Sequence, residues 1–415
     1  MLDIERIRNN PNEVRNGLKR RGADISLVDE FLDVDKQWRS MQAEVQELRH
    51  QQKESGKKRD IETAKELKEK IKNTEQNLRD LEKKRHELLI TFPNIPFDDV
   101  PDGGGEEGNV SLREVGAVPT FAFDIRDHLA LGEMLDIIDT AKAAEVSGAR
   151  FYYLKNEGAL LEFALVRFVT DILVKEGFIP VIPPVMIRPD VYEKMGRLTP
   201  DQRDERYYLG QDDLYLVGSA EHTLGPLHMD DVLDEDDLPR RYAGFSTCFR
   251  REAGSYGKDT RGILRVHQFD KLEMYVFADP KHSEEEHKFL LDTQEKIYAA
   301  LNIPYRVMSI CTGDMGPTDA RQFDIEAWIP SQNKYREVTS CSNTTDYQTR
   351  GIKTKVRRQD GTAEYAHALN ATAVAISRTL IAILENNQRK DGTVIVPKSL
   401  RKYTGFKTIA PKKRQ

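Results

Sequence analysis

The sequence predicts an α+β fold, in which a mostly antiparallel sheet flanked by helices follows a long antiparallel helical hairpin. Apolar residues recur at alternating spacings of three and four in residues 31–48 and again in residues 64–88, which is typical of a coiled-coil seam. Proline, glycine and acidic residues then gather at about residues 91–112. Beyond them, strand-like blocks and helices alternate without the βαβ rhythm of a parallel sheet, which favours an antiparallel one.

The composition is that of a globular protein with more than one domain. The chain has 415 residues, of which 39% are hydrophobic and 8% aromatic, so a sizeable core is available. No apolar run is long enough to cross a bilayer, and the charged start, MLDIERIRNNPNEV, is unlike a signal peptide. We therefore expect a cytoplasmic protein. Its cysteines, Cys248, Cys311 and Cys341, lack disulfide or zinc-site spacing.

The first predicted element is the helical hairpin, over about residues 27–90. Its seam positions are Phe31, Val34, Trp38, Met41, Val45 and Leu48 in one helix and Ala64, Leu67, Ile71, Thr74, Leu78, Leu81, Arg85 and Leu88 in the other. Thr74 and Arg85 are the imperfect positions. Gly56 lies among polar residues between the two stretches, so we expect the chain to reverse there. Each helix, of about 27 residues, would be ~40 Å long.

The function of this arm is open from periodicity alone, which favours dimerisation or bundle packing over RNA binding. The tip, however, carries Lys53, Lys57, Lys58 and Arg59. A solvated tip has no packing need for so many like charges, and they suit contacts with phosphate groups. The net charge of −6 argues against a basic surface over the whole protein, but it does not argue against such a local site.

The domain boundary is predicted in the segment TFPNIPFDDVPDGGGEEGNV, because proline, glycine and acidic residues are typical of linkers. We expect an N-terminal domain over residues 1–100, a linker over 101–112 and a second domain over 113–415.

Two elements of the second domain follow from local pattern. An apolar stripe predicts a helix that ends at Gly177; it consists of Leu160, Leu161, Ala164, Leu165, Phe168, Val169, Ile172 and Leu173. The next stretch, FIPVIPPVMI, predicts an extended segment. Pro180, Pro183 and Pro184 cannot donate to a sheet ladder, so this segment is expected at an edge or an interface.

A pair of predicted strands presents a polar face. In AGFSTCFRRE, period-two alternation places Arg250 and Glu252 on one face with Cys248, and Phe249 and Arg251 on the other. The returning strand aligns Arg265, His267, Phe269, Lys271 and Glu273. Arginine matches phosphate oxygens, and an aromatic ring can stack on a base. The pattern fits a nucleotide site, and a solvated hairpin is the open alternative.

The loop between these strands, AGSYGKDTRG, contains Gly254, Gly257 and Gly262. Glycines tolerate many backbone conformations, so we expect this loop to move or to close over a ligand.

The unit FRREAGSYGKDTRGILRVHQFDKLEM resembles motif 2 of the seryl-tRNA synthetases, a class II aminoacyl-tRNA synthetase family, in its standard form without zinc. The likeness covers essentially the whole chain, because the helical hairpin, GFIPVIPPVMI, GSAEHTL, REVTSCSN and HALNATAVAISRTLIAILEN follow in the family's order. Motifs 1, 2 and 3 correspond to about residues 157–188, 241–275 and 366–387. The resemblance implies the class II fold and a homodimer.

The resemblance also implies a reaction and its partners. L-serine and ATP would form seryl-adenylate, and the seryl group would pass to the 3′ end of tRNA(Ser) and, where it is present, tRNA(Sec). Mg²⁺ is implied as the metal that accompanies ATP. The arm would contact the tRNA, while neither DNA nor a membrane is expected as a partner.

The family's functional residues carry over to matching positions of this sequence. Catalysis is assigned to Arg250 and Arg378, which bind ATP together with Arg251, Glu252, Arg265, Phe269, Glu337, Val338, Thr339 and Ser340. L-serine is assigned to Ser219, Ala220, Glu221, Glu273, Asn370 and Thr372. Glu337 and Ser340 are implied as metal ligands. Strict alternation does not place those two on one face, so a bulge or a strand end is expected between them.

Some features depart from the bacterial pattern of the family. Ser219 stands where threonine is usual, and Ala371, Ala373 and Ser377 replace the usual glycines of motif 3. We expect this loss of glycines to narrow the space beside ATP.

Three alternatives remain from the sequence. Related enzymes that load carrier proteins lack the long arm and carry a zinc-ligand cysteine. The zinc-dependent form of the synthetase is disfavoured, because no cysteine or histidine cluster accompanies Glu273. An inactive homologue that binds RNA or acts as a scaffold is expected to lose Arg250, Glu273 or Arg378, and all three are present.

Overall fold

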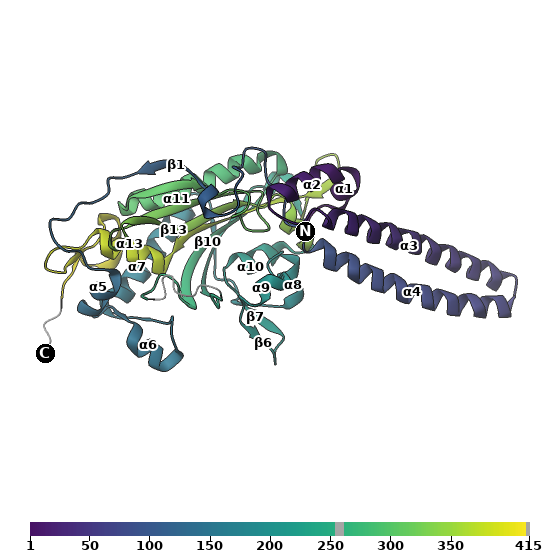
Figure 1. The fold of residues 1–415 in the computed structure, drawn as a ribbon, viewed down its shortest axis with the longest axis horizontal. Helices are drawn as coiled ribbons and strands as arrows, with labels where there is room; N and C mark the ends of the chain where they lie inside the picture. Colours follow the sequence, from purple (N-terminus) through teal and green to yellow (C-terminus); the bar gives the residue numbers. More distant parts are fainter. Residues whose placement is uncertain (254–260, 412–415) are drawn as a thin grey trace. The chain divides into compact units, whose positions relative to one another are not determined.

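The computed structural model describes residues 1–253 and 261–411. Most of the glycine-rich loop predicted to close over a ligand, with Gly254 and Gly257, lies outside the described residues. The chain divides into two compact units, Met1–Ile95 and Pro96–Gln415 (Figure 1). In the described ranges, no helix combines the length and the apolar character needed to cross a bilayer.

The first unit consists of helices, and its long pair confirms the predicted hairpin (Figure 1). The helices are α1 (Ile4–Asn9), α2 (Pro11–Arg20), α3 (Leu27–Lys57) and α4 (Ile61–Leu89). Every predicted seam position of α3 and α4 is buried or half-buried. The spacing of apolar residues alone therefore identified which faces of the two helices meet.

The polar side chains at both imperfect seam positions have hydrogen-bond partners. The Thr74 hydroxyl donates to the Lys70 carbonyl oxygen of its own helix at 2.9 Å. The Arg85 guanidinium lies 4.4 Å from the ring centroid of Trp38 and donates to Asp35 Oδ1 at 2.8 Å. Asp35 is completely buried, so Arg85 supplies charge compensation that an apolar residue could not provide.

The chain reverses within the predicted segment KESGKKRD, although not at Gly56 itself. Gly56 lies in the last turn of α3, and the reversal occurs at Arg59, whose φ is +59°. Asp60 then begins α4 by accepting a hydrogen bond from the Thr63 N–H at 3.1 Å. This cap fixes the start of the second helix, so the left-handed residue has to be Arg59, a side chain that rarely adopts this conformation.

The second unit is built on an eight-stranded sheet. Its strands, in spatial order, are β1 (Val110–Val115), β11 (Tyr305–Ser309), β12 (Arg321–Ile329), β13 (Lys334–Asn343), β16 (His367–Ala375), β10 (Gln268–Ala278), β9 (Arg240–Phe249) and β4 (Ile179–Val181). All neighbours are antiparallel except β4 and β9, which are parallel. The predicted antiparallel sheet is thus confirmed, and the proline-rich segment lies at its edge.

The main apolar core joins this sheet to α7 (Asn156–Lys175), α11 (Ser283–Leu301) and α13 (Ile376–Asn386), and also includes Leu131 of α5 (His128–Met134). The apolar stripe predicted α7 correctly, and Gly177 just beyond it has φ +85°. The α11 helix is also tied to the sheet by Gln294, whose amide donates to the carbonyl oxygens of Ser340 and Thr372, both at 2.8 Å. The helix thereby braces the strands that carry these two residues.

Shorter elements complete the second unit. The helices are α5 (His128–Met134), α6 (Thr140–Ser147), α8 (Pro189–Lys194), α9 (Pro200–Arg203), α10 (Glu221–Leu224), α12 (Tyr347–Ile352) and α14 (Arg401–Thr404). The strands are β2 (Ile138–Asp139), β3 (Tyr153–Leu154), β5 (Met186–Ile187), β6 (Tyr208–Leu209), β7 (Leu214–Leu216), β8 (Val232–Asp234), β14 (Lys355–Arg357), β15 (Ala363–Tyr365), β17 (Val394–Ile395) and β18 (Thr408–Ile409).

The segment predicted as a linker, residues 101–112, is packed into the second unit. The Gly103 carbonyl oxygen accepts from the Gly313 N–H at 2.9 Å, and Asn109 Oδ1 accepts from the Cys311 N–H at 2.9 Å. A Cβ at Gly103 would lie only 2.7 Å from the Cys311 sulfur. The glycine is therefore needed for close packing, whereas its presence in the sequence had indicated flexibility.

Candidate active site

Two adjoining pockets lie beside the sheet strands β9, β10, β13 and β16. We call the first the arginine pocket; it is lined by Arg250, Glu252, Arg265, Phe269, Lys271, Glu337, Val338, Thr339, Ser340, Thr372, Ser377 and Arg378. We call the second, of about 440 Å³, the carboxylate pocket; it is lined by Arg197, Arg206, Ser219, Glu221, Lys271, Glu273, Asn370 and several residues of the arginine pocket. Because Arg250, Glu337 and Arg378 line both, the pockets are continuous.

Three arginines converge in the arginine pocket. Arg250, just beyond the end of β9, donates to the Gly218 carbonyl oxygen at 3.2 Å, and its guanidinium lies 5.4 Å from the Phe269 ring centroid. Arg265 pairs with Glu252 at 3.4 Å. Guanidinium groups around one ring suit a ligand that has both phosphate groups and an aromatic base.

Arg378 is the third arginine and is held in place by Glu337. Its Nη1 donates to the Glu337 carbonyl oxygen at 3.0 Å and lies 3.1 Å from the carboxylate. The positive charge of Arg378, together with that of Arg250, outweighs burial and lowers the pKa of Glu337 below its ordinary value. Glu337 is therefore ionised at neutral pH and is available as an anionic ligand.

The bulge expected between Glu337 and Ser340 is present. Ile325 pairs with Thr339, whereas the next residue, Glu326, pairs with Glu337. Val338 is thus the extra residue, and Glu337 and Ser340 both line the arginine pocket. This irregularity is what brings the two side chains to one site.

The donor set of Glu337 and Ser340 fits Mg²⁺ only together with a phosphate ligand. One carboxylate and one hydroxyl leave most of an octahedral coordination shell to phosphate oxygens and water, which is how Mg²⁺ usually binds. Within the described part of the chain, no three or more His, Cys, Asp and Glu side chains gather to hold a metal ion by themselves.

The carboxylate pocket contains two almost fully buried glutamates, Glu221 and Glu273, which are 5% and 1% exposed. Within the described ranges, the donors to Glu221 all meet Oε1, which accepts from Arg197 Nε and Nη2 at 3.0 and 2.7 Å and from Gln348 Nε2 at 2.7 Å. Glu273 Oε2 is engaged by Lys271 at 2.5 Å and by the Thr372 hydroxyl at 3.1 Å, and no other described residue contacts this carboxylate. Each carboxylate therefore keeps one oxygen for a ligand.

These two glutamates differ in acidity. Burial opposes ionisation of both. In Glu221 the charge of Arg197 and the hydrogen bond from Gln348 outweigh burial, so its pKa lies below the ordinary value. In Glu273 burial prevails over Lys271, and the nearby negative charge of Glu221 adds to it, so the pKa is raised. Environments that push two carboxyl pKa values apart indicate different tasks.

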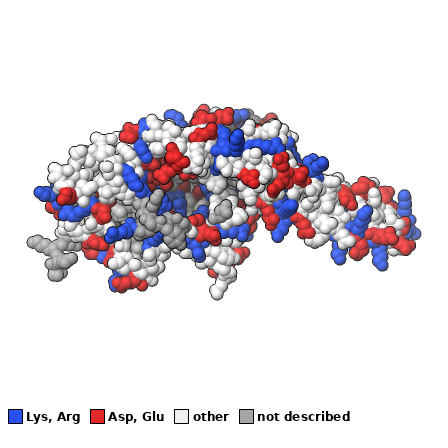
Figure 2. Space-filling model, in the orientation of Figure 1, with Lys and Arg blue, Asp and Glu red and all other residues white. Residues whose placement is uncertain are grey.

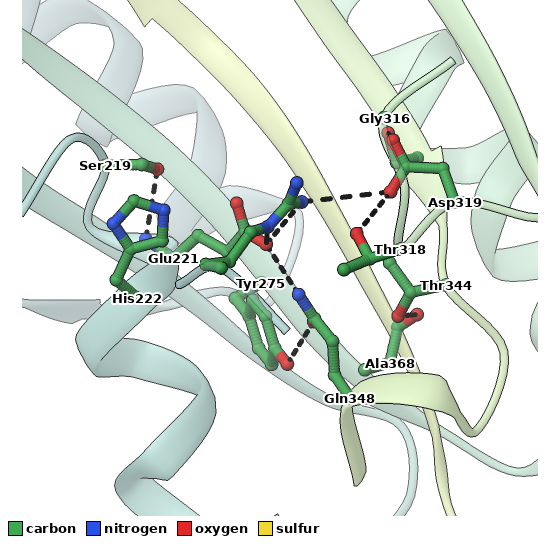
Figure 3. A network of polar contacts seen from close by, with 12 residues as sticks. Ser219, Glu221, His222, Tyr275, Gly316, Thr318, Asp319, Thr344, Gln348 and Ala368 are labelled. Atoms are coloured by element: carbon green, nitrogen blue, oxygen red, sulfur yellow. Dashed lines mark hydrogen bonds and ion pairs between the residues drawn. The ribbon is translucent and has the colours of Figure 1, made fainter. Parts of the chain in front are cut away.

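Polar groups complete the carboxylate pocket. The Ser219 hydroxyl accepts from the Glu221 N–H at 3.2 Å, as Figure 3 shows. Asn370 Nδ2 is buried without a hydrogen-bond partner among the described residues. Because an unsatisfied buried donor is costly, a ligand that accepts a hydrogen bond there would be stabilised.

The alanines that replace motif 3 glycines do not narrow the pocket, contrary to the expectation from the sequence. Ala371 and Ala373 belong to the apolar core, whereas Asn370 and Thr372 of the same strand line the pockets. Strand alternation explains the difference, because odd and even residues point to opposite faces. Ser377, from α13, is the replacement that does line the arginine pocket.

Two predicted site residues lie away from the pockets. Ala220 is completely buried in the small core beneath α10. Arg251 faces another cavity, which it lines with Arg150 and His267, and its guanidinium lies 5.2 Å from the Tyr207 ring centroid. Period-two alternation had placed Arg251 on the strand face opposite to Arg250, and the two side chains do line different cavities.

Several residues of the site were not assigned a role from the sequence, among them Arg197, Lys271 and Gln348. Lys271 carried a signal, because it shares the polar face of its strand with Phe269 and Glu273. Arg197 and Gln348 lie 24 and 127 positions from Glu221, their common partner. Neither falls in a local pattern, so only the fold reveals them.

The cationic residues at the arm tip belong to the first unit. Lys53, Lys57, Lys58 and Arg59 are all exposed, and the end of the hairpin shows basic side chains interspersed with acidic ones (Figure 2). One acidic neighbour, Glu54, pairs with Lys57 at 2.6 Å. The tip is thus a solvated and mixed, but locally basic, surface.

Comparisons with known proteins agree with this geometry. Residues 1–96 match the family model for the seryl-tRNA synthetase N-terminal domain, and residues 207–387 match the class II tRNA synthetase core domain (G, H, P, S and T). A serine–tRNA ligase of Acidothermus cellulolyticus is 47% identical over the full length of both chains.

Solved structures show the same likeness. A seryl-tRNA synthetase from Pyrococcus horikoshii, crystallised with ATP, has a TM-score of 0.93 and 43% identity, with both chains covered completely. A cytoplasmic serine–tRNA ligase from Naegleria fowleri in complex with AMP has a TM-score of 0.88 and 35% identity over 100% of this chain and 99% of that one. With both of its units matched and full-length relatives well above 30% identity, the chain belongs to the seryl-tRNA synthetase family.

Proposed function

We propose that this chain is a serine–tRNA ligase that activates L-serine with ATP and transfers the seryl group to the 3′ end of tRNA(Ser), and to tRNA(Sec) where it is present. One observation carries the proposal: a pocket of three arginines around Phe269 continues into a pocket in which Glu221 and Glu273 each keep one open oxygen. The first suits a nucleotide, and the second suits a small ligand with cationic and hydroxyl groups.

In the first step, a carboxylate oxygen of serine attacks the α-phosphorus of ATP, and the bond to the bridging oxygen of pyrophosphate breaks. Arg250 holds the α-phosphate and the serine carboxylate, while Arg265 and Arg378 hold the outer phosphates. Glu252 faces the adenine, and Phe269 stacks on it. No nucleophile from the protein is needed, because positioning and charge neutralisation lower the barrier.

Glu337 and Ser340 are the residues that would hold Mg²⁺ together with ATP, and the metal would supply neutralisation of phosphate charge. In the second step, the terminal ribose hydroxyl of the tRNA attacks the seryl carbonyl carbon and AMP leaves. Arg250, which holds the α-phosphate, then stabilises AMP as the leaving group.

The two glutamates, which differ in pKa, take different groups of serine. Glu221, with its lowered pKa, takes the ammonium group through Oε2. Glu273 and Thr372 take the hydroxyl group, and Ser219 and Asn370 complete the site. Alanine would leave these buried polar groups unpaired, so we expect its rejection by roughly 10⁴-fold, whereas threonine has to be excluded by size.

The arm tip supports a role in tRNA binding, since Lys53, Lys57, Lys58 and Arg59 are exposed. Contacts with phosphate groups require no base sequence. A tRNA substrate also fits a cytoplasmic location.

A homodimer is supported by exposed apolar side chains on the predicted motif 1 segment. Leu160, Phe163 and Val174 of α7 are 49%, 69% and 50% exposed, and Ile182 beside β4 is 86% exposed. Apolar side chains gathered at one element are typical of an interface rather than of a free surface.

The test is amino-acid-dependent ATP–pyrophosphate exchange, run with and without Mg²⁺, followed by charging of total tRNA. We expect exchange with serine only, a requirement for Mg²⁺, and formation of seryl-tRNA. Exchange without charging would indicate a carrier protein or another acceptor. No exchange with any amino acid would overturn the proposal in favour of an inactive homologue.

A further inference from the structure

The one-sided hydrogen bonding of Glu221 has a clear source. All three donors to its carboxylate, two from Arg197 and one from Gln348, meet Oε1 at 2.7–3.0 Å. No described group donates to Oε2. A carboxylate free to rotate would not distinguish its two oxygens, so Arg197 and Gln348 together fix which oxygen is open.

The orientation of Gln348 is determined by its neighbours. An ionised carboxylate only accepts hydrogen bonds, so the Gln348 amide has to present its nitrogen to Glu221. Its oxygen then accepts from the Tyr275 hydroxyl at 2.9 Å. Tyr275 is completely buried, and burial together with the charge of Glu221 raises its pKa well above the ordinary value. It therefore stays a neutral donor, and the order Tyr275, Gln348, Glu221 has one direction (Figure 3).

Arg197 is anchored on the other side. Its Nη2 lies 3.8 Å from Asp319 Oδ1. Asp319 in turn accepts from the Thr318 hydroxyl at 2.8 Å and from the Ser342 hydroxyl at 3.0 Å. A Cβ at Gly316 would come within 2.6 Å of Asp319 Oδ2, so this corner is tightly packed. The guanidinium thus approaches Glu221 from a fixed position.

We propose that Gln348, oriented by Tyr275, is a positioning residue that works with Arg197 to occupy Oε1 of Glu221 and to present Oε2 to the ammonium group of the amino acid. The proposal rests on the function proposed above, because it takes L-serine as the ligand. Gln348 and Tyr275 touch no substrate; they act through Glu221.

The charge state of Glu221 depends on the same contacts. The titratable and charged groups that surround it are Arg197, Arg206, His222, Arg250, Lys271, Glu273, Tyr275 and Asp319. His222 stays neutral, since burial, and next the charge of Arg206, lower its pKa well below the ordinary value. Removing the Gln348 donor leaves burial less opposed, which raises the pKa of Glu221 and weakens its hold on an ammonium group.

The test compares Gln348→Met, which keeps length but removes the donor, with Tyr275→Phe, which removes only the hydroxyl that orients Gln348. In serine-dependent ATP–pyrophosphate exchange, we expect Gln348→Met to raise the KM for serine roughly 10- to 100-fold. Tyr275→Phe should raise it less. The KM for ATP and kcat at saturating serine should stay near wild-type values for both.

A pH profile separates positioning from a general packing role. In both variants, the acidic limb of kcat/KM for serine should shift to higher pH, with the larger shift in Gln348→Met. A matched control is Tyr298→Phe, since Tyr298 is another buried tyrosine. Its hydroxyl lies 3.0 Å from the Thr379 hydroxyl, and it lines neither pocket. It should change neither the KM nor the pH profile.

Two results would overturn the inference: an acidic limb that does not move, or a KM for ATP that rises as much as the KM for serine. If Gln348→Met fails to fold, Tyr275→Phe still decides the question, because it deletes one oxygen atom. Failure of the proposed function is distinguishable, since the wild-type protein would then show no serine-dependent exchange. If the wild-type protein is active with serine and both variants behave like it, the inference is refuted while the proposed function stands.

Discussion

Asp35 in the first unit and Glu221 in the second are both buried carboxylates that face arginine, yet they are neutralised differently. Arg8 and Arg85 contact Asp35 Oδ1 at 2.7 and 2.8 Å, while Arg8 and Arg39 contact Oδ2 at 2.8 and 3.0 Å. Both of its oxygens are thus engaged by the protein. In Glu221 the residues that the structure describes engage one oxygen, Oε1.

This difference separates a carboxylate that stabilises the fold from one that binds a ligand. Full engagement compensates the buried charge and ties α1 and α4 to α3 through Asp35. One-sided engagement keeps Glu221 ionised but leaves an acceptor that only a ligand can satisfy. We therefore expect substitution of Asp35 to change stability and substitution of Glu221 to change activity.

Glu221→Gln should have the largest effect. It removes the negative charge opposite the serine ammonium group, in a buried site where loss of one charge partner costs several kcal/mol. We expect kcat/KM for serine to fall roughly 10²- to 10³-fold, measured by pyrophosphate exchange. Its thermal unfolding should change less than that of an Asp35 variant. Near-normal serine activation by Glu221→Gln would contradict the proposal that Glu221 binds the ligand.

Asp35→Asn should have the next largest effect, and on stability. Three arginines lose their common partner, so we expect the first unit to lose about 3 kcal/mol of unfolding free energy. Chemical denaturation followed by circular dichroism of the helices measures this loss. Serine-dependent exchange should stay unchanged, because the pocket proposed to bind serine lies in the second unit. A large loss of exchange, with normal helix stability, would contradict the assignment of Asp35 to the fold.

The pH dependence of stability sharpens the same comparison. Burial alone would raise the pKa of Asp35, but Arg8 and Arg85 outweigh it and hold that pKa below the ordinary value. The stabilisation is therefore complete above the unfolded-state pKa, about 3.9, and is lost as the pH falls through the lower folded-state pKa. Denaturation of the first unit from pH 7 down to about pH 2 should show this loss in the wild type, chiefly below about pH 4. A pH-independent wild-type curve would mean that Asp35 is not ionised in the folded protein.

How much of this was readable from the sequence depends on how local each feature is. The seam of α3 and α4, the edge segment at Pro180 and the bulge between Glu337 and Ser340 follow from periodicity, from missing donors and from alternation. The residues whose contacts distinguish Glu221 from Asp35 do not follow from any such local pattern. Gln348 reaches Glu221 from 127 positions away, and no spacing rule connects them.

Glycine shows a second limit of local patterns. Gly56 and Gly103 both looked like flexible positions. One lies inside a helix, while the other is required by the close approach of Cys311. A glycine occurs either where a Cβ would clash or where a side chain is not needed, and only the packing around it shows which of the two applies.

Exposed charges should matter less than either buried carboxylate. Charge reversal at the arm tip, with Lys57→Glu, Lys58→Glu and Arg59→Glu combined, would remove the proposed phosphate contacts without changing either pocket. We expect kcat/KM for tRNA in charging to fall roughly 10-fold at moderate salt, and its salt dependence to become shallower. Serine-dependent exchange should be unaffected. Unchanged charging at low salt would show that the tip does not contact the tRNA.

Arg39→Gln should have the smallest effect and tests whether exposure grades the contribution of each arginine to Asp35. The Arg39 side chain is 53% exposed, whereas that of Arg85 is 16% exposed. Water already screens the charge of Arg39, so its loss should cost under about 1 kcal/mol. Arg85→Gln should cost more, because Arg85 also packs on Trp38. Equal losses in the two variants, measured by denaturation at neutral pH, would mean that Asp35 needs all its arginines alike and that solvent access does not rank them.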